Sequence, residues 1–122
     1  MHQVLQLKSV KRSGRSVGVA ISLGFGINKS KGFHMTFANN LTLSVQFGPG
    51  NYCDNYDEPF DLSGVRKDYK SSNAEVAVFS ASNGAWFTRV FMPEAGDDVV
   101  GYLTPNQVAE LIVKVAAYSE EA

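Results

Sequence analysis

The feature that most constrains the fold is an alternation of apolar and polar residues over positions 33–48. It predicts the two strands of a β-hairpin, because successive side chains of a strand point to opposite faces. A two-residue loop at positions 39–40 would place Phe37 opposite a threonine and mix the faces. A three-residue loop at positions 38–40 pairs Phe37 with Leu41 and keeps the apolar residues together, so we predict the longer loop.

The three-residue loop also fixes the rest of the hairpin. Its last residue, Asn40, has to adopt a left-handed backbone conformation, which asparagine tolerates better than most residues. Met35 then faces Leu43, and the side of the hairpin that carries them is wholly apolar. The opposite side is polar and carries His34, Thr36, Thr42, Ser44 and Gln46.

Length and composition indicate one globular unit. The chain has 122 residues, of which 44% are hydrophobic and 19% are charged, and this suits a single domain over residues 1–122. No apolar run approaches the roughly 18 residues of a membrane-spanning helix, and the N-terminus lacks the apolar core of a signal peptide. We therefore expect a cytoplasmic protein that does not bind membranes. The single cysteine, Cys53, excludes an intrachain disulfide and fits a reducing compartment.

Charge is segregated along the chain. Before Asp54 there are six basic residues and no acidic ones, and from there onward twelve acidic residues face five basic ones. Such segregation can mark a basic surface for a phosphate-bearing partner. The alternative, which we favour, is that the acidic half folds back over the basic half.

Strands are also expected before the central hairpin. Residues 3–10 and 17–23 alternate in the manner of strands, with a polar turn between them. The glycines of residues 24–26 predict that the second strand ends there, and the polar, basic segment up to Gly32 predicts a loop.

Residues 49–73 form the longest stretch without a periodic apolar pattern. Loops of this length are uncommon in compact domains and are usually functional or disordered. This one contains four aromatic residues, which is unusual for a disordered linker: Tyr52, Tyr56, Phe60 and Tyr69. We predict an ordered loop, with a helical turn near residues 62–69, that lies over one face of the sheet.

A second hairpin is predicted from residues 75–81 and 85–91, around an Asn-Gly turn signal. A two-residue turn and a three-residue turn ending at Gly84 are both compatible with the signal. We favour the three-residue turn because it pairs Phe79 with Phe87.

The C-terminal part predicts a helix over residues 105–118. Thr104 is the expected N-cap, Pro105 occupies the first helical position, and Gln107 completes a capping box. Apolar residues follow at helical spacing: Val108, Leu111, Ile112, Val115 and Ala116. The whole chain is therefore expected to be α+β, an antiparallel sheet of four to six strands with one C-terminal helix packed on one face.

The sequence contains no recognisable catalytic or metal-binding set. Cys53 has acidic neighbours and no base beside it, so a packing role is favoured over a nucleophilic one. One cysteine and two histidines at scattered positions match no metal-ligand spacing, and the glycine-rich turns lack the phosphate-binding pattern. A pI near 6.1 argues against general nucleic-acid binding. We expect no cofactor and no metal.

A polar surface next to aromatic residues is the remaining candidate site. Tyrosine, tryptophan, asparagine and arginine are usual components of ligand pockets and protein interfaces. We predict that the long loop and the polar side of the hairpin together form one binding site. Its residues are Thr42, Ser44, Gln46, Asn51, Tyr52, Asn55, Tyr56, Trp86 and Arg89. The alternative is an ordinary solvated sheet face.

Residues 36–40, 43–55, 73–78 and 97–105 resemble small uncharacterised proteins encoded by tailed bacteriophages. The resemblance covers roughly residues 32–118 and carries no catalytic motif. It implies a phage accessory protein that acts inside a bacterium.

We therefore expect a small binding protein, a candidate for counter-defence, that blocks a host protein or sequesters a small nucleotide-like signal. One alternative is a small nucleotide-processing enzyme, in which Cys53, His34 and an acid would converge in a concave site. Another is a virion or assembly component, which would show a large apolar patch and a symmetric homo-oligomer.

Overall fold

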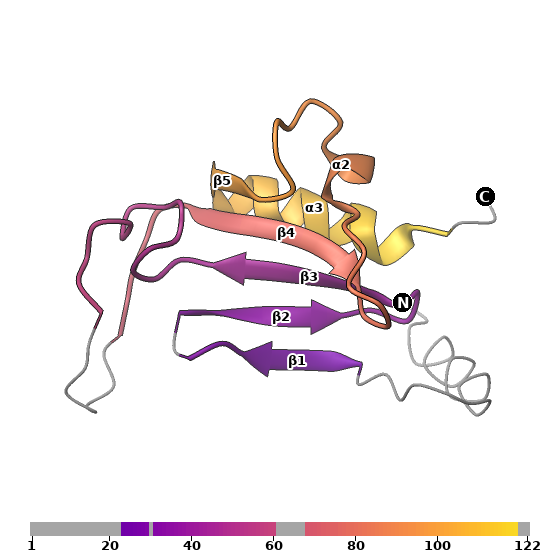
Figure 1. Cartoon of the computed structure of the whole chain (residues 1–122), viewed down its shortest axis with the longest axis horizontal. Helices are drawn as coiled ribbons and strands as arrows, with labels where there is room; N and C mark the ends of the chain where they lie inside the picture. The colour runs from indigo at the N-terminus through magenta and orange to yellow at the C-terminus, as the bar shows by residue number, and fades with distance from the viewer. Residues whose placement is uncertain (1–22, 30, 61–67, 120–122) are drawn as a thin grey trace.

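The computed structural model describes residues 23–29, 31–60 and 68–119. Its elements are β1 (Gly24–Ile27), β2 (Gly32–Thr36), β3 (Leu41–Gln46), β4 (Ala74–Ser80), α2 (Thr88–Phe91), β5 (Val100–Leu103) and α3 (Pro105–Ala117). The strands form one antiparallel sheet in the order β1-β2-β3-β4-β5, and α3 packs against one face of it (Figure 1). The α+β prediction is confirmed. The strands expected at residues 3–10 and 17–23 and the turn near 62–69 lie almost wholly outside the described residues.

Strands β2 and β3 form the central hairpin in the predicted register. The backbone N–H of Phe37 donates to the carbonyl of Leu41 over 2.9 Å, which closes the three-residue loop. Asn40 has a φ of 74°, the left-handed conformation that this loop requires. Met35 faces Leu43 as expected. The alternation of apolar and polar residues was therefore sufficient to predict the register of this hairpin.

Strand β1 corrects the prediction that the chain breaks and loops after residue 23. Phe25 pairs with Met35 of β2, and the backbone N–H of Asn28 donates to the carbonyl of Gly32 over 2.9 Å at the connecting turn. Glycine has a low strand propensity, which made the segment look like a break. The prediction was wrong because pairing with β2 overrides that local preference.

The turn of the second hairpin also differs from the prediction. The N–H of Ser80 donates to the carbonyl of Ala85 over 2.8 Å, and Phe79 forms a bridge with Trp86, so the turn has four residues, 81–84. The Ser80 hydroxyl accepts hydrogen bonds from two backbone N–H groups of the turn over 3.3 and 3.4 Å, which favours the longer turn.

The return strand predicted at residues 85–91 ends early, and α2 takes its place. Thr88 is fully buried, and its hydroxyl accepts from the N–H of Val78 over 2.9 Å and donates to the carbonyl of Asp98 over 2.6 Å. This side chain replaces the backbone bond that a continued strand would make. The remaining edge of β4 pairs with β5 instead.

Helix α3 begins as predicted. The Thr104 hydroxyl accepts from the N–H of Gln107 over 3.2 Å, and the Gln107 side chain accepts from the N–H of Thr104 over 2.8 Å. Leu111 and Val115 are buried against the sheet. The core consists of Leu41, Leu43, Val45, Ala74, Val76, Val78, Leu103, Leu111 and Val115. At the other end of the helix, the Asn39 amide donates to the carbonyls of Val115 and Tyr118 over 2.7 and 3.0 Å.

The helix covers only part of the sheet. Among the described strands α3 contacts β3, β4 and β5, whereas β1 and β2 extend beyond its cover (Figure 1). On β1, Phe25 and Ile27 are consequently 81% and 77% exposed. The sheet therefore has a covered half, β3 to β5, and an uncovered half, β1 and β2.

Candidate functional site

The structure places the nine predicted site residues in different parts of the molecule. Thr42, Ser44 and Gln46 share the polar side of the sheet, as expected, but they bond to one another and to their neighbours. The Thr42 hydroxyl lies 2.8 Å from that of Thr36, and the Gln46 amide donates to Ser44 Oγ over 3.1 Å and to Asn28 Oδ1 over 2.7 Å. Thr42 and Ser44 are buried. These groups therefore join strands and offer little to a ligand.

Asn51 and Asn55 hold the long loop against the end of the sheet. The Asn51 amide donates to the Glu75 carboxylate over 2.8 Å. The Asn55 amide donates to the carbonyls of Phe47 and Lys70 over 2.7 and 3.1 Å. The sequence had suggested that the loop lies over the polar side of the sheet. The described part of the loop lies instead at the end of the sheet (Figure 1). The side chains of Asn51 and Asn55, which the sequence suggested as ligand contacts, therefore bond within the protein and hold the loop in place.

Asp54 joins the two limbs of the loop. Its carboxylate accepts hydrogen bonds from the N–H and hydroxyl of Ser72 over 2.8 and 2.7 Å, and its own N–H donates to Asn73 Oδ1 over 2.9 Å. The bonds from Ser72 stabilise the charged form and lower the pKa of Asp54 below its usual value. The loop is therefore an ordered structure at both described ends.

Tyr52 and Tyr56 stack on each other with ring centroids 5.6 Å apart, and each is 46% exposed. The carbonyl of Tyr52 accepts from the N–H of Tyr102 over 3.0 Å, which brings the loop beside β5. Tyr102 has a φ of 61°, an unusual conformation for a bulky residue, and its side chain is exposed. Sequence reasoning missed Tyr102, because a left-handed tyrosine leaves no local signal.

Trp86 and Arg89 lie apart from the tyrosines. Trp86 packs against Phe79 in a T-shaped arrangement, with ring centroids 6.1 Å apart, and Phe79 packs against His34 in the same way at 5.6 Å. Partial burial lowers the pKa of His34. Arg89 belongs to α2 and donates to the carbonyl of Gly96 over 3.2 Å. The structure therefore does not bring the predicted set together as one site.

Cys53 is a buried residue, in keeping with the packing role expected of it. Its Sγ lies 3.7 Å from the carbonyl oxygen of Gly48 and accepts from the N–H of Asn55 over 3.3 Å. His34 stands in the middle of β2 against Phe79, away from the loop that contains this thiol. Within residues 23–29, 31–60 and 68–119, no three histidine, cysteine or acidic side chains cluster so as to hold a metal ion.

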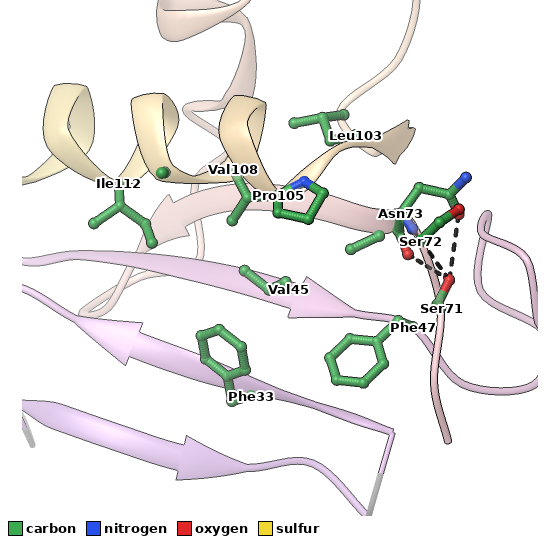
Figure 2. Close-up of a pocket in the computed structure, with 12 residues that line it drawn as sticks. Phe33, Val45, Phe47, Ser71, Ser72, Asn73, Leu103, Pro105, Val108 and Ile112 are labelled. Atoms are coloured by element: carbon green, nitrogen blue, oxygen red, sulfur yellow. Dashed lines mark hydrogen bonds between the residues drawn. The ribbon is translucent and has the colours of Figure 1, made fainter.

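An apolar groove between α3 and the sheet is the site that the sequence analysis did not identify (Figure 2). Its volume is about 280 Å³. The floor comes from β2, β3 and the residue after β3, one wall comes from α3, and residues 71–73 close one end. The lining residues are Phe33, Val45, Phe47, Ser71, Ser72, Asn73, Ala74, Leu103, Pro105, Val108, Ala109 and Ile112.

The groove exists because one helix is narrower than this sheet. Five strands spaced about 4.8 Å apart span roughly 19 Å, whereas a helix with its side chains is about 10 Å wide. Leu111 and Val115 direct α3 toward the core, so its neighbouring face, with Val108 and Ile112, borders open space. The sequence did indicate some uncovered apolar surface, in the excess of apolar strand positions over those that a single helix covers, but it did not indicate where the groove lies.

The chemistry of the groove is that of a binding surface. Its lining contains no ionisable side chain, and its polar groups are confined to residues 71–73. Ser71 Oγ bonds to the carbonyl of Asn73 over 2.6 Å, so this end is already internally paired (Figure 2). Apolar side chains are the ligands that such a surface accepts.

Comparisons with protein-family models, with curated proteins and with solved structures found no match to this chain. None of the helices described is long and apolar enough to cross a membrane.

Proposed function

We propose that this chain is a small non-enzymatic binding protein that blocks a host protein by taking apolar side chains of that protein into the groove. The observation that carries the proposal is an open apolar groove beside α3, lined by residues of several elements, none of which is ionisable. The phage setting, an accessory or counter-defence role in the bacterial cytoplasm, is supported only by the sequence resemblance over residues 32–118.

A protein partner fits the groove better than a nucleotide does. Phosphate groups need cationic side chains or converging backbone N–H groups, and the lining residues supply no cation. A volume of about 280 Å³ is also slightly below the usual range of small-molecule pockets, about 300 to 1,000 Å³. One or two large apolar side chains of a partner match both the size and the chemistry.

An assembly component is the second candidate, because a second apolar surface favours it. Phe25 and Ile27 are large, apolar and strongly exposed at the other edge of the same sheet face. Exposed apolar surface of this kind marks interaction sites on soluble proteins. Growth of the protein into particles or filaments at rising concentration would favour this candidate over a blocking protein.

The test compares two alanines on α3. Ala109 lines the groove and Ala116 does not, and both are exposed, so Arg substitution at either position leaves the core intact. Tagged full-length chain would be used to capture proteins from a bacterial lysate. We expect Ala109→Arg to lose at least about tenfold of a captured host protein that Ala116→Arg retains.

A photo-crosslinking amino acid at the same two positions would locate the contact. Crosslinking of the captured protein from position 109 but not from position 116 is the expected result. Equal capture by both Arg variants, at unchanged melting temperatures, would show that the groove is not the binding site.

A further inference from the structure

Strand β1 presents a hydrogen-bonding edge to which no other described residue is paired. The N–H of Asn28 donates to the carbonyl of Gly32, and hydrogen-bonded pairs alternate along an antiparallel ladder. Gly26 is therefore the next residue of β1 whose backbone groups point to β2. It follows that Phe25 and Ile27 direct their N–H and C=O groups toward the outer edge.

The side chains of the same two residues form an apolar pair on the surface. Phe25 pairs with Met35 and Ile27 with Phe33, so both lie on the face of the sheet that carries α3. Their exposed fractions are 81% and 77%. Edge strands are normally protected by short length, a charged residue, a proline or a bulge. Gly24–Ile27 is short, with four residues, but has no charged residue, proline or bulge.

We propose that β1 is the contact strand of a two-fold homodimer, in which it pairs antiparallel with β1 of a second copy, centred on Gly26. In this register Phe25 faces the partner's Ile27, and Ile27 faces the partner's Phe25. The outward N–H and C=O groups of each residue then meet the outward groups of the other, and the two five-stranded sheets become continuous. Aromatic side chains opposite β-branched ones are favourable cross-strand pairs.

The residues of β1 favour a second copy over another occupant. Because Phe25 and Ile27 are placed symmetrically about Gly26, a two-fold axis midway between the Gly26 residues of the two copies gives every outward apolar residue an apolar partner. The axis also holds Lys29 of one copy about 20 Å from the partner's Lys29, at roughly 3.4 Å per residue, beyond the screening length of physiological salt, about 8 Å. Each copy uses its β1 edge once, so the assembly closes as a dimer.

The expected dimer is weak. Each copy contributes two large side chains and a four-residue strand, so the total buried area falls below the roughly 1,200 Å² of standard interfaces. Its population should therefore depend on protein concentration. Sedimentation velocity of the full chain between about 1 and about 500 µM spans the range in which such an interface dissociates.

A cysteine at position 26 tests the register. Opposed residues of a non-hydrogen-bonded pair have Cα atoms about 4.5 Å apart, within the range that a disulfide bridges. A Cβ built at Gly26 meets no atom within 4 Å, so Gly26→Cys is accommodated by the monomer. We expect mild oxidation of the full chain to give a covalent dimer through position 26. The control, Ala116→Cys, places an exposed thiol on α3 and should stay monomeric.

Charge at the edge tests the association itself. Phe25→Lys should raise the dissociation constant of the dimer at least about tenfold, whereas Val113→Lys, a change at a 67% exposed position of α3, should leave it unchanged. The proposal is overturned by an equal disulfide yield from positions 26 and 116, or by a monomer at every concentration. Both results would follow if residues 1–22 occupy the edge instead. Species that grow beyond the dimer overturn its two-fold closure. Capture of a host protein by Phe25→Lys is measured separately. The proposed dimer and the proposed function of the groove can therefore each fail without the other.

Discussion

The two halves of the sheet carry similar apolar patterns and have opposite fates. Leu43 on β3, Met35 on β2 and Phe25 on β1 lie in one row on the same face. Leu43 is completely buried, Met35 is half-buried and Phe25 is 81% exposed. The difference is the position of α3, which covers β3 to β5 and leaves β1 and β2 uncovered. Apolar alternation thus predicts which face a residue joins, and only the covering layer decides whether that residue becomes core.

The largest expected effect contrasts the two halves directly. Leu111→Ala removes a side chain that is only 4% exposed, and should lower the free energy of unfolding by about 2 to 5 kcal/mol through lost burial and the remaining cavity. Phe25→Ala removes a larger side chain from the uncovered half and should cost less than about 0.5 kcal/mol.

Urea denaturation at low protein concentration, where the dimer does not contribute, measures both values. Comparable losses for the two variants would show that the uncovered half is part of the core. The contrast between the halves would then not hold.

A smaller effect on stability is expected where the loop between β2 and β3 is hydrogen-bonded to the end of α3. Asn39 belongs to the β2–β3 loop, and its amide donates to the carbonyls of Val115 and Tyr118 at the end of α3. Asn39→Ala leaves these carbonyls without this donor and should lower the free energy of unfolding by about 1 to 3 kcal/mol.

Asn83→Ala, in the turn after β4, is a suitable control, because within the described part of the chain its side chain makes only a local bond, which it accepts from the N–H of Ala85. Hydrogen exchange of the last turn of α3 should be faster in Asn39→Ala alone. Unchanged exchange there would mean that the loop does not fix the end of the helix.

The sequence predicted the parts of the fold whose causes are local. The register of β2 and β3 follows from alternation and from the left-handed Asn40, and the start of α3 follows from Thr104 and Gln107. Strand β1 was missed because its stability comes from pairing with β2 rather than from its own residues.

The candidate site was less predictable for the same reason. Sequence reasoning placed Thr42 on the correct face, but the hydroxyl of Thr36, 2.8 Å away, already satisfies it. The groove depends on where α3 lies over the sheet, which is set by packing of Leu111 and Val115 against strands far away in the sequence. No local pattern of residues records that offset.

The smallest expected effect is a dependence of stability on pH, which His34 causes on the polar side of the uncovered half. Partial burial lowers the pKa of His34 in the folded state below its ordinary value of 6.5, because the charged imidazolium is less well solvated there. The folded state therefore binds fewer protons than the unfolded state between these two pKa values, and its stability rises with pH in that window. The stabilisation is complete above about pH 6.5 and declines as the pH falls below it.

His34→Gln should flatten this decline, since glutamine does not titrate. The loss of stability that Asp54 contributes below about pH 4, because its pKa is also lowered, should persist in both proteins. Unfolding free energies from urea titrations at a series of pH values between about 2 and 8 measure both effects. A slope between pH 5 and 7 that is the same in His34→Gln and in the original chain would show that His34 is as well solvated in the folded state as in the unfolded one, and that the polar side of the sheet is open even beside Phe79.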